Sequence, residues 1–506
     1  MIFSHDNSVL TSTAIQEVGQ FILKQREQWA MGPPDFERFE HELHEHIMAV
    51  ERELLAEELA RYDVTAEQIE VDGVTYRQTL TSSKTYLTSA GEVSITRKLY
   101  RPSGRGSKSI CPLELRTGII GGYWTPRAAR QAASMVARVT PGEGETMFDE
   151  MGGMRPSRCS LDRLPKKLSP HWEANRQEWE AALRTRETVS REAAMLVISV
   201  DGVTIRMKGR RAKPDRPGKH ASGPTGQKEA GCGTVILHNA EGERLQTVRY
   251  GRMPECRKVT LQQQLETEAM SILTVRPDLK RVLLTDGARD NWRVLAEVNQ
   301  ACGPSPQPSV EILDFYHACD HLKEGCDAAW GESTSRSKTE FERLRKQLKE
   351  KDDGAVRIIN MLRYHYGRAR GHKRKRLKTQ LTYFCNQKHR MHYAEYIRQG
   401  LPIGSGVVEA ACKTLVTQRM KQSGMMWSQT GGQAILTLRS LIQSDRWKPA
   451  WELLRAEFRK TVTVCDAHET FPDVARPDMV PPEQFVFRQP VIVLSHIDHA
   501  AISLVA

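Results

Sequence analysis

The chain has 506 residues, too many for one ordinary core, and its length predicts two to four domains. Charged residues make up 27% of it and its apolar runs are only strand-length, which excludes a membrane-spanning helix of roughly 20 residues. The net charge of +12 favours an anionic partner, nucleic acid before a membrane surface, and ten scattered cysteines without a CxxC pair fit a reducing cytoplasm.

The first region, residues 1–65, is predicted to be helical. Apolar residues recur at three- and four-residue spacing between Phe36 and Leu54 and form one stripe. Asp35 follows a Gly-Pro-Pro breaker and is the expected start of this helix. The stripe favours packing within the chain over self-association.

Two small modules are expected next. Residues 66–120 predict a small β-rich module, because GEVSITRKLYRP alternates apolar and polar side chains. Residues 121–190 predict three helices, the first capped by Thr125 and the third starting near Ser160. Their pattern resembles a helix-turn-helix DNA-binding module. Pro165 interrupts the expected recognition helix, so a plain helical linker domain stays open as an alternative.

From residue 191 the pattern changes to strands that alternate with helices. The runs MLVISV, GTVILHN and ERLQTVRY predict three strands, and after a helix RVLLTD and VEILDF predict two more with a helix between them. This order is typical of a ribonuclease H-like sheet. We therefore expect an α/β protein with a ribonuclease H-like catalytic core and a helical insertion, preceded by a mostly helical region with the small β module. The core would occupy 191–330 and 401–460, the basic helical insertion 331–400, and an extended C-terminal tail 461–506.

Three acidic residues carry the chemical prediction. Asp201 and Asp286 each begin an Asp-Gly pair at or near the end of an apolar, β-branched run, and Glu409 lies in the first turn of an amphipathic helix. In a ribonuclease H-like sheet the first and fourth strands are neighbours, so the two aspartates would meet there, and a helix packed on the sheet could add the glutamate. Such a carboxylate set binds two Mg²⁺ or Mn²⁺ ions about 3.5–4 Å apart for phosphodiester cleavage.

Each acid also has a structural interpretation. Asp-Gly is a common turn dipeptide, so either aspartate alone would more often end a strand than bind a metal. Glu409 could favour the dipole of its helix and pair with Lys413 one turn later. The order of the three acids and the elements that carry them favour the catalytic interpretation.

The segment DFYHACDHL adds two accessory candidates. Asp314 ends a strand and is a candidate accessory acid, less favoured than the main three. His317 and His321 are four residues apart on the following helix, a spacing that could bind zinc. We favour a structural or DNA-facing role for His317.

Two basic stretches predict the contacts to DNA. The run RYHYGRARGHKRKRLK (363–378) has few balancing acids and interleaved tyrosines, which favours DNA contact over a solvated helix face. The stretch RMKGRRAKPDRPGKH (206–220) predicts a loop that reaches a phosphate backbone. The candidate DNA-binding residues are Arg206, Lys208, Arg210, Arg211, Arg368, Arg370, Lys373, Arg374, Lys375, Arg376, Lys413, Arg419 and Lys421.

Four motifs resemble those of DDE transposases of bacterial insertion sequences, in particular the ISKra group, which is distantly related to Mutator-like elements. They are VISVDGVTIRMKGRR, VLLTDGARDNW, EILDFYHACDHL and LPIGSGVVEAACKTLVTQRMKQSGMMWS. The similarity extends to VDGVTYR and YLTSAGEVSITRKLYRP and covers most of residues 60–445.

The resemblance implies an acidic triad of Asp201, Asp286 and Glu409 that binds two Mg²⁺ or Mn²⁺ ions. It implies cleavage at element ends and attack of the freed 3′-hydroxyl on target DNA. The expected partners are double-stranded DNA, as terminal inverted repeats and target, and further copies of the chain. A nucleoid-associated place in a bacterial cytoplasm is implied as well, with no membrane partner.

Two other functions stay open. A ribonuclease H-like, structure-selective nuclease would cleave DNA but join nothing. A catalytically silent DNA-binding regulator derived from a transposase would bind DNA without nicking it, although the presence of all three acids argues against this alternative.

Overall fold

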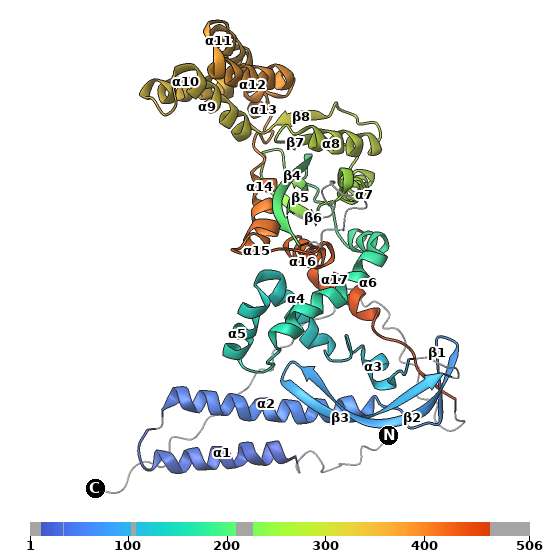
Figure 1. Cartoon of the computed structure of the whole chain (residues 1–506). Coiled ribbons are helices and arrows are strands. Elements are labelled where there is room, and N and C mark those ends of the chain that lie inside the picture. Colours follow the sequence, from blue (N-terminus) through green and yellow to red (C-terminus); the bar gives the residue numbers. More distant parts are fainter. Residues whose placement is uncertain (1–11, 34, 103–107, 209–225, 466–506) are drawn as a thin grey trace, which may run out of the picture.

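The protein is elongated, with a central sheet between a helical end and an end that contains helices and a second sheet (Figure 1). The computed structural model describes residues 12–33, 35–102, 108–208 and 226–465. No helix in these ranges is both long and apolar enough to cross a bilayer.

A five-stranded mixed sheet forms the centre, with the order β6-β5-β4-β7-β8. Its strands are β4 (Met195–Met207), β5 (Gly226–His238), β6 (Arg244–Arg252), β7 (Lys280–Thr285) and β8 (Val310–Leu313). The pairs β4–β5 and β5–β6 are antiparallel, whereas β4–β7 and β7–β8 are parallel. This is the strand order expected from the sequence, and the predicted α/β, ribonuclease H-like class is confirmed.

The crossover helices explain why the strands read as continuous apolar runs. Helices α7 (Val259–Val275) and α8 (Arg289–Ala301) connect the strands and pack on the sheet. Leu265 and Leu295 are fully buried with the strand residues in one large core. A strand covered on both faces has no solvated side to mark with polar residues.

Strand β4 is longer than its apolar run. Beyond Val200 it continues to Met207, paired with the start of β5 as a two-stranded ribbon. Gly202 lies opposite Gly231 in this ribbon, and a Cβ on Gly202 would approach within 2.2 Å of the Glu229 carboxylate. The Asp-Gly pair indicates the end of a strand, but Asp201 lies inside β4.

The N-terminal end holds a helical hairpin and a second sheet. Asp35 caps the second helix, as expected, by accepting a hydrogen bond from the Glu37 backbone N–H. The hairpin consists of α1 (Thr13–Trp29) and α2 (Phe36–Arg61), followed by β1 (Gln68–Val71), β2 (Val74–Thr88), β3 (Gly91–Pro102) and the short helix α3 (Pro112–Thr117). Strand β9 (Thr463–Val464) pairs with β1 and completes the four-stranded sheet. The expected tail thus begins as a strand, and residues 466–506 lie outside the described residues.

A helical module connects this end to the central sheet. It contains α4 (Pro126–Arg138), α5 (Pro141–Met151) and α6 (Arg158–Arg184), which pack against α16 (Gln429–Gln443) and α17 (Trp447–Ala456) from the C-terminal part. Helix α6 is capped by a serine, as expected, and the cap is Ser157, three residues before Ser160. It also runs through Pro165 without ending, so the expected interruption is wrong. The helical turns on either side of Pro165 are held in the core of the module by three buried leucines on one face of α6: Leu161, Leu164 and Leu168.

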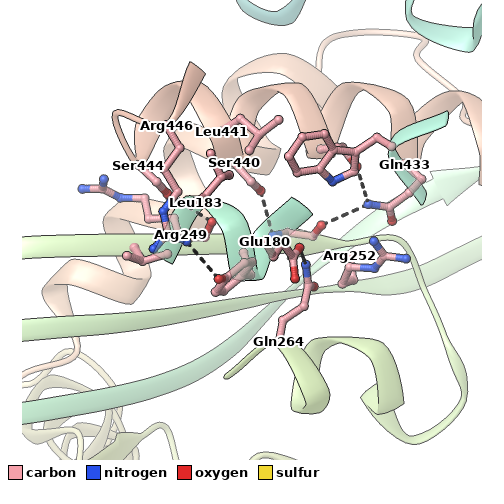
Figure 2. A pocket seen from close by; sticks show the side chains of 15 residues that line it. Glu180, Leu183, Arg249, Arg252, Gln264, Gln433, Ser440, Leu441, Ser444 and Arg446 are labelled. Atoms are coloured by element: carbon pink, nitrogen blue, oxygen red, sulfur yellow. Dashed lines mark hydrogen bonds between the residues drawn. The ribbon is translucent and has the colours of Figure 1, made fainter. Parts of the chain in front are cut away.

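The joint between the module and the sheet is polar. Figure 2 shows the small cavity there, lined from α6, β6, α7 and α16. Gln264 donates a 2.6 Å hydrogen bond to the buried carboxylate of Glu180, and Gln433 accepts one of 2.9 Å from the Met253 backbone N–H. Arg446 joins the same network through Glu268. Because buried polar groups are costly when unpaired, such a network favours one docking geometry.

The insertion forms the opposite end of the molecule (Figure 1). Two tyrosines attach it to the sheet edge: Tyr393 and Tyr396 donate hydrogen bonds of 3.0 and 3.2 Å to backbone carbonyls of Leu313 and Glu311. Its helices are α10 (Ser335–Glu350), α11 (Gly354–Arg368), α12 (Gly371–Gln387) and α13 (Tyr393–Arg398). Helix α9 (Phe315–Trp330), which lies before the predicted start at residue 331, packs with α10, α11 and α12.

Candidate active site

Asp201 and Asp286 lie side by side on the central strands. Val200 and Thr285 form the last parallel pair between β4 and β7, and the two aspartates are the next residues on each strand. Neighbouring strands are about 4.8 Å apart. The Thr285 hydroxyl donates a 2.7 Å hydrogen bond to the Val200 carbonyl and fixes this pair. The strand order thus brings the two acids together, as the sequence predicted.

Asp201 is a half-buried carboxylate with a raised pKa. Burial raises the pKa of Asp201 above its ordinary value, and the charge of Asp286 raises it further. The Gly202 backbone N–H, at 2.6 Å from Oδ1, and the charge of Lys258 act in the opposite direction. A cation between the two aspartates would relieve their repulsion.

Asp286 is oriented by two N–H donors. Its Oδ1 accepts hydrogen bonds from the Ala288 backbone N–H and Asn291 Nδ2, at 3.1 and 3.0 Å, and lies 3.1 Å from the Thr285 hydroxyl, whose proton goes to Val200. The turn after β7 therefore fixes this carboxylate, and no donor is recorded on Oδ2 among the described residues.

The glutamate helix packs against β4 (Figure 1). It comprises α14 (Gly406–Ala411), a π-helical segment at Cys412–Thr417 and α15 (Gln418–Met420). The Cys412 thiol donates a 3.4 Å hydrogen bond to Asp201 Oδ2. Contact with the Cys232 thiol, burial and the Asp201 carboxylate raise the pKa of Cys412, so it stays a protonated donor. π-Helical segments are rare and are frequently found at functional sites.

Glu409 lies one helical turn before Cys412 and is exposed. Within the described residues its side chain has no hydrogen bond or ion pair, and the expected pairing with Lys413 is absent. The described residues also contain no cluster of three or more His, Cys, Asp or Glu side chains able to hold a metal ion. The structure therefore assembles the aspartate pair and brings the glutamate helix to it, while the Glu409 carboxylate is not joined to the pair.

Asp314 connects the sheet edge to the glutamate helix. It is buried, and its carboxylate accepts one hydrogen bond from the His317 backbone N–H, at 2.6 Å, and one from the Ser405 backbone N–H. Phe315 donates a 2.9 Å backbone hydrogen bond to Ile403 beside it. With both oxygens engaged by amides, Asp314 caps α9 and positions the start of α14.

His317 is exposed, and its ring lies 5.5 Å from that of His321. His321 is held in place: it is stacked at 3.6 Å on Tyr383 and shares a 2.7 Å hydrogen bond with Gln380. Burial lowers the pKa of His321. The packing accounts for His321, while His317 is left facing solvent near the start of the insertion.

Two residues of this site, Lys258 and Asn291, were missed in the sequence. Lys258 Nζ lies 2.6 Å from Asn291 Oδ1 and 2.7 Å from Glu229 Oε1, and Asn291 in turn holds Asp286. Asn291 is 2% exposed. Arg257 and Lys258 both have a positive φ, of 54° and 51°, a strained conformation for non-glycine residues. Nothing in the local sequence marks a lysine that approaches from the loop before α7.

The candidate DNA-binding residues near Glu409 are mostly exposed. Arg206, Lys208, Lys413 and Lys421 all face solvent. The backbone of Arg206 and Lys208 is bonded to Trp427, which fixes the direction of the ribbon. Arg210 and Arg211 lie outside the described residues.

The DNA contact expected of Arg419 is wrong. Its side chain is 2% exposed, and Nε donates a 3.2 Å hydrogen bond to the Val136 carbonyl of α4. Burial lowers the pKa of Arg419 to about 10. This arginine ties the end of the glutamate helix to the helical module.

The basic residues of the insertion fall into two groups. Arg368, stacked 3.7 Å over Tyr364, and Arg370 and Lys375 are exposed and have no acidic partner among the described residues. The others have partners within the chain: Lys373 with the Ala329 carbonyl, Arg374 over Tyr366, and Arg376 with Glu324 and Glu332.

This division predicts which charges contribute to DNA affinity. The double variant Arg370→Gln/Lys375→Gln is expected to lower the slope of log affinity against log salt by about 2, because each phosphate contact contributes roughly 0.9. Fluorescence anisotropy with a random duplex at several salt concentrations measures this slope. The matched control is Arg357→Gln, whose guanidinium already pairs with Asp353 at 2.7 Å. Equal slopes for both variants would contradict the assignment.

Comparisons with known proteins add little. No family model and no curated protein matches the sequence. Among solved structures, the chain is similar to one in a Drosophila P element transposase strand transfer complex, at 10% identity and a TM-score of 0.24, covering 65% of this chain and 80% of that chain.

Proposed function

We propose that the protein is an insertion-sequence transposase that cleaves DNA at element ends and joins them to target DNA. The observation that carries the proposal is the aspartate pair: Asp201 and Asp286 meet on adjacent central strands of a ribonuclease H-like sheet, and a glutamate-bearing helix touches Asp201 through Cys412. Either aspartate alone would be unremarkable at a strand end.

The donor set fits hard divalent cations. Asp201 and Asp286 offer carboxylate oxygens, and Mg²⁺ prefers oxygen ligands. Burial, and then the charge of Asp286, raise the pKa of Asp201, so a cation here would be favourable. In the proposal these two residues and Glu409 hold two Mg²⁺ or Mn²⁺ ions. When bound, such ions would activate the attacking oxygen and stabilise the leaving oxygen.

Glu409 is the part of the proposal that requires a rearrangement. Its exposed carboxylate has no partner among the described residues, so no existing bond must break before it can turn toward the aspartates. The adjoining π-helical segment is a place where the helix can change its register.

Lys258 and Asn291 serve as positioning residues. Asn291 holds the Asp286 carboxylate, and the charge of Lys258 lowers the pKa of Asp201. Together they keep the two acids in place when no cation balances them. The exposed basic side chains around Glu409 and on the insertion would bind double-stranded DNA, both the terminal inverted repeats and the target. We expect the protein to act as an oligomer on this DNA.

A strand-transfer assay tests the proposal. The full chain is incubated with linear DNA that carries the inverted repeats flanking its gene, a supercoiled target plasmid and Mg²⁺. We expect nicking at the repeat ends and joined products with the plasmid. Cleavage without joined products would favour the structure-selective nuclease. Binding without cleavage in Mg²⁺ and in Mn²⁺ would favour the silent regulator.

A further inference from the structure

A second cavity, to which the proposed function gives no role, lies where the helical module meets the glutamate helix. It is a cavity of about 460 Å³, formed by the end of α4, strand β6, the π-helical segment, α15 and α16. Three arginines line it, Arg138, Arg249 and Arg439, with polar Thr414, Gln418 and Gln443 and apolar Ala137 and Ile442. No carboxylate is among the lining residues.

The arginines of this cavity have no ion-pair partner among the described residues. Arg439 is buried, Arg249 is half-buried and Arg138 is exposed at the rim, whereas most of the other partly buried arginines form ion pairs. Burial lowers the pKa of Arg439 to about 10, and the neighbouring charges of Arg419 and Arg138 act in the same direction. Burial and Arg244 likewise lower the pKa of Arg249, and the charge of Asp445 offsets only part of this effect. An anion in the cavity would offset these costs.

The arginines are held in place and still have donors to offer. Arg439 is 6% exposed and donates to the backbone carbonyls of Leu415, Ala137 and Thr414. These bonds occupy three of the five N–H groups of a guanidinium. Arg249 donates to the Gln443 carbonyl and Arg138 to Ser134. Guanidinium groups anchored by carbonyls suit the tetrahedral oxygens of a phosphate.

The cavity lies apart from the acidic residues. Cys412 and Thr414 belong to the same π-helical segment, but the first contacts Asp201 and the second lines the cavity. None of Asp201, Asp286 or Glu409 lines it. Binding here therefore does not depend on the proposed catalysis.

We propose that Arg138, Arg249 and Arg439 form a phosphate-binding pocket at the joint between the helical module and the glutamate helix. The phosphate belongs to a DNA backbone or to a free phosphorylated compound. In either case the ligand would bridge α4 to the segment that carries Glu409.

Two variants and a matched control test this pocket in the full chain. Arg138→Gln removes an exposed rim charge whose side chain, among the described residues, hydrogen-bonds to Ser134 alone, and Arg249→Gln removes a half-buried charge. Arg130→Gln on the same helix α4 removes an exposed charge outside the cavity. Inorganic pyrophosphate is titrated by calorimetry, and a short random duplex is titrated by anisotropy. The melting temperature without anion checks that each variant is folded.

We expect pyrophosphate to bind, each pocket variant to weaken it roughly tenfold, and Arg130→Gln to leave it nearly unchanged. If the pocket variants also weaken duplex binding more than Arg130→Gln does, the phosphate comes from DNA. If the pocket variants weaken only pyrophosphate binding, the phosphate that the pocket binds belongs to a free compound. Equal behaviour of all three variants with both probes would overturn the pocket, and if Arg249→Gln does not fold, Arg138→Gln decides alone. Asp201→Asn should bind pyrophosphate like the wild type, which separates this outcome from that of the proposed catalysis.

Discussion

Asp201→Asn is expected to abolish metal-dependent nicking, with a loss of roughly a thousandfold or more, the scale seen when a preorganised catalytic group is removed. The amide keeps the shape of the side chain and can still accept the Cys412 hydrogen bond. It cannot supply the anionic oxygen that a divalent cation needs beside Asp286. Conversion of supercoiled to nicked plasmid measures the rate, and duplex binding by the same preparation should be unchanged.

The same variant is expected to stabilise the protein in the absence of metal. Burial and the neighbouring Asp286 raise the pKa of Asp201 in the folded chain. A raised pKa means that the ionised carboxylate costs folding free energy, and that stability is lost as the pH rises through the raised pKa. Asparagine never ionises. With a chelator present, its melting temperature should exceed that of the wild type at neutral pH, and the difference should disappear in acid.

Asp290→Asn is the matched control, because Asp290 is exposed on the first turn of α8, close to Asp286 in the chain. It should change neither nicking nor melting temperature. Nicking by Asp201→Asn at the wild-type rate would show that the acid pair is not the active site. Loss of nicking together with a fall in melting temperature would point to a structural role for Asp201.

The sheet and the aspartate pair could be predicted from the sequence for a physical reason. Strands covered on both faces leave uninterrupted apolar runs, and the order of strands and helices determines which of them are neighbours. Once β4 and β7 are adjacent, the register Val200 to Thr285 brings Asp201 and Asp286 together. Local caps such as Asp35 were equally predictable, because a side-chain acceptor before an apolar stripe is a local signal.

Long-range contacts left no such signal. Arg419 looks like any basic residue after an amphipathic helix, and only the arrival of α4 from a distant part of the chain buries it against Val136. Lys258 enters the site through two consecutive left-handed residues, a conformation that no pattern of residue types indicated. Pro165 predicts an interruption of the helix, but the buried leucines around it keep α6 continuous. In each case tertiary packing decides what local preference does not.

Arg446→Met is expected to have the largest effect on stability, a loss of about 3–5 kcal/mol in the free energy of unfolding. Arg446 Nη2 lies 2.6 Å from one oxygen of Glu268, and its Nη1 lies 3.0 Å from the other. It also pairs with Glu187. Although burial alone would lower the pKa of Arg446, the groups around it, Tyr250 and the two glutamates, raise it overall. Without the guanidinium, the carboxylate of Glu268, whose side chain is 2% exposed, loses its principal partner.

Urea titration followed by tryptophan fluorescence measures this loss. Arg455→Met is the control: it breaks the exposed pair between Arg455 and Glu452 on the adjoining helix and should cost less than about 1 kcal/mol. The double variant Arg446→Met/Glu268→Leu should regain much of the stability, because replacing a whole buried pair by apolar groups is often neutral. Arg446 precedes α17, whereas Glu268 belongs to α7 beside the sheet, so a loss confined to the single variant would show that this pair joins the helical module to the sheet. A cost as small as that of the control would mean that apolar packing alone holds the two together.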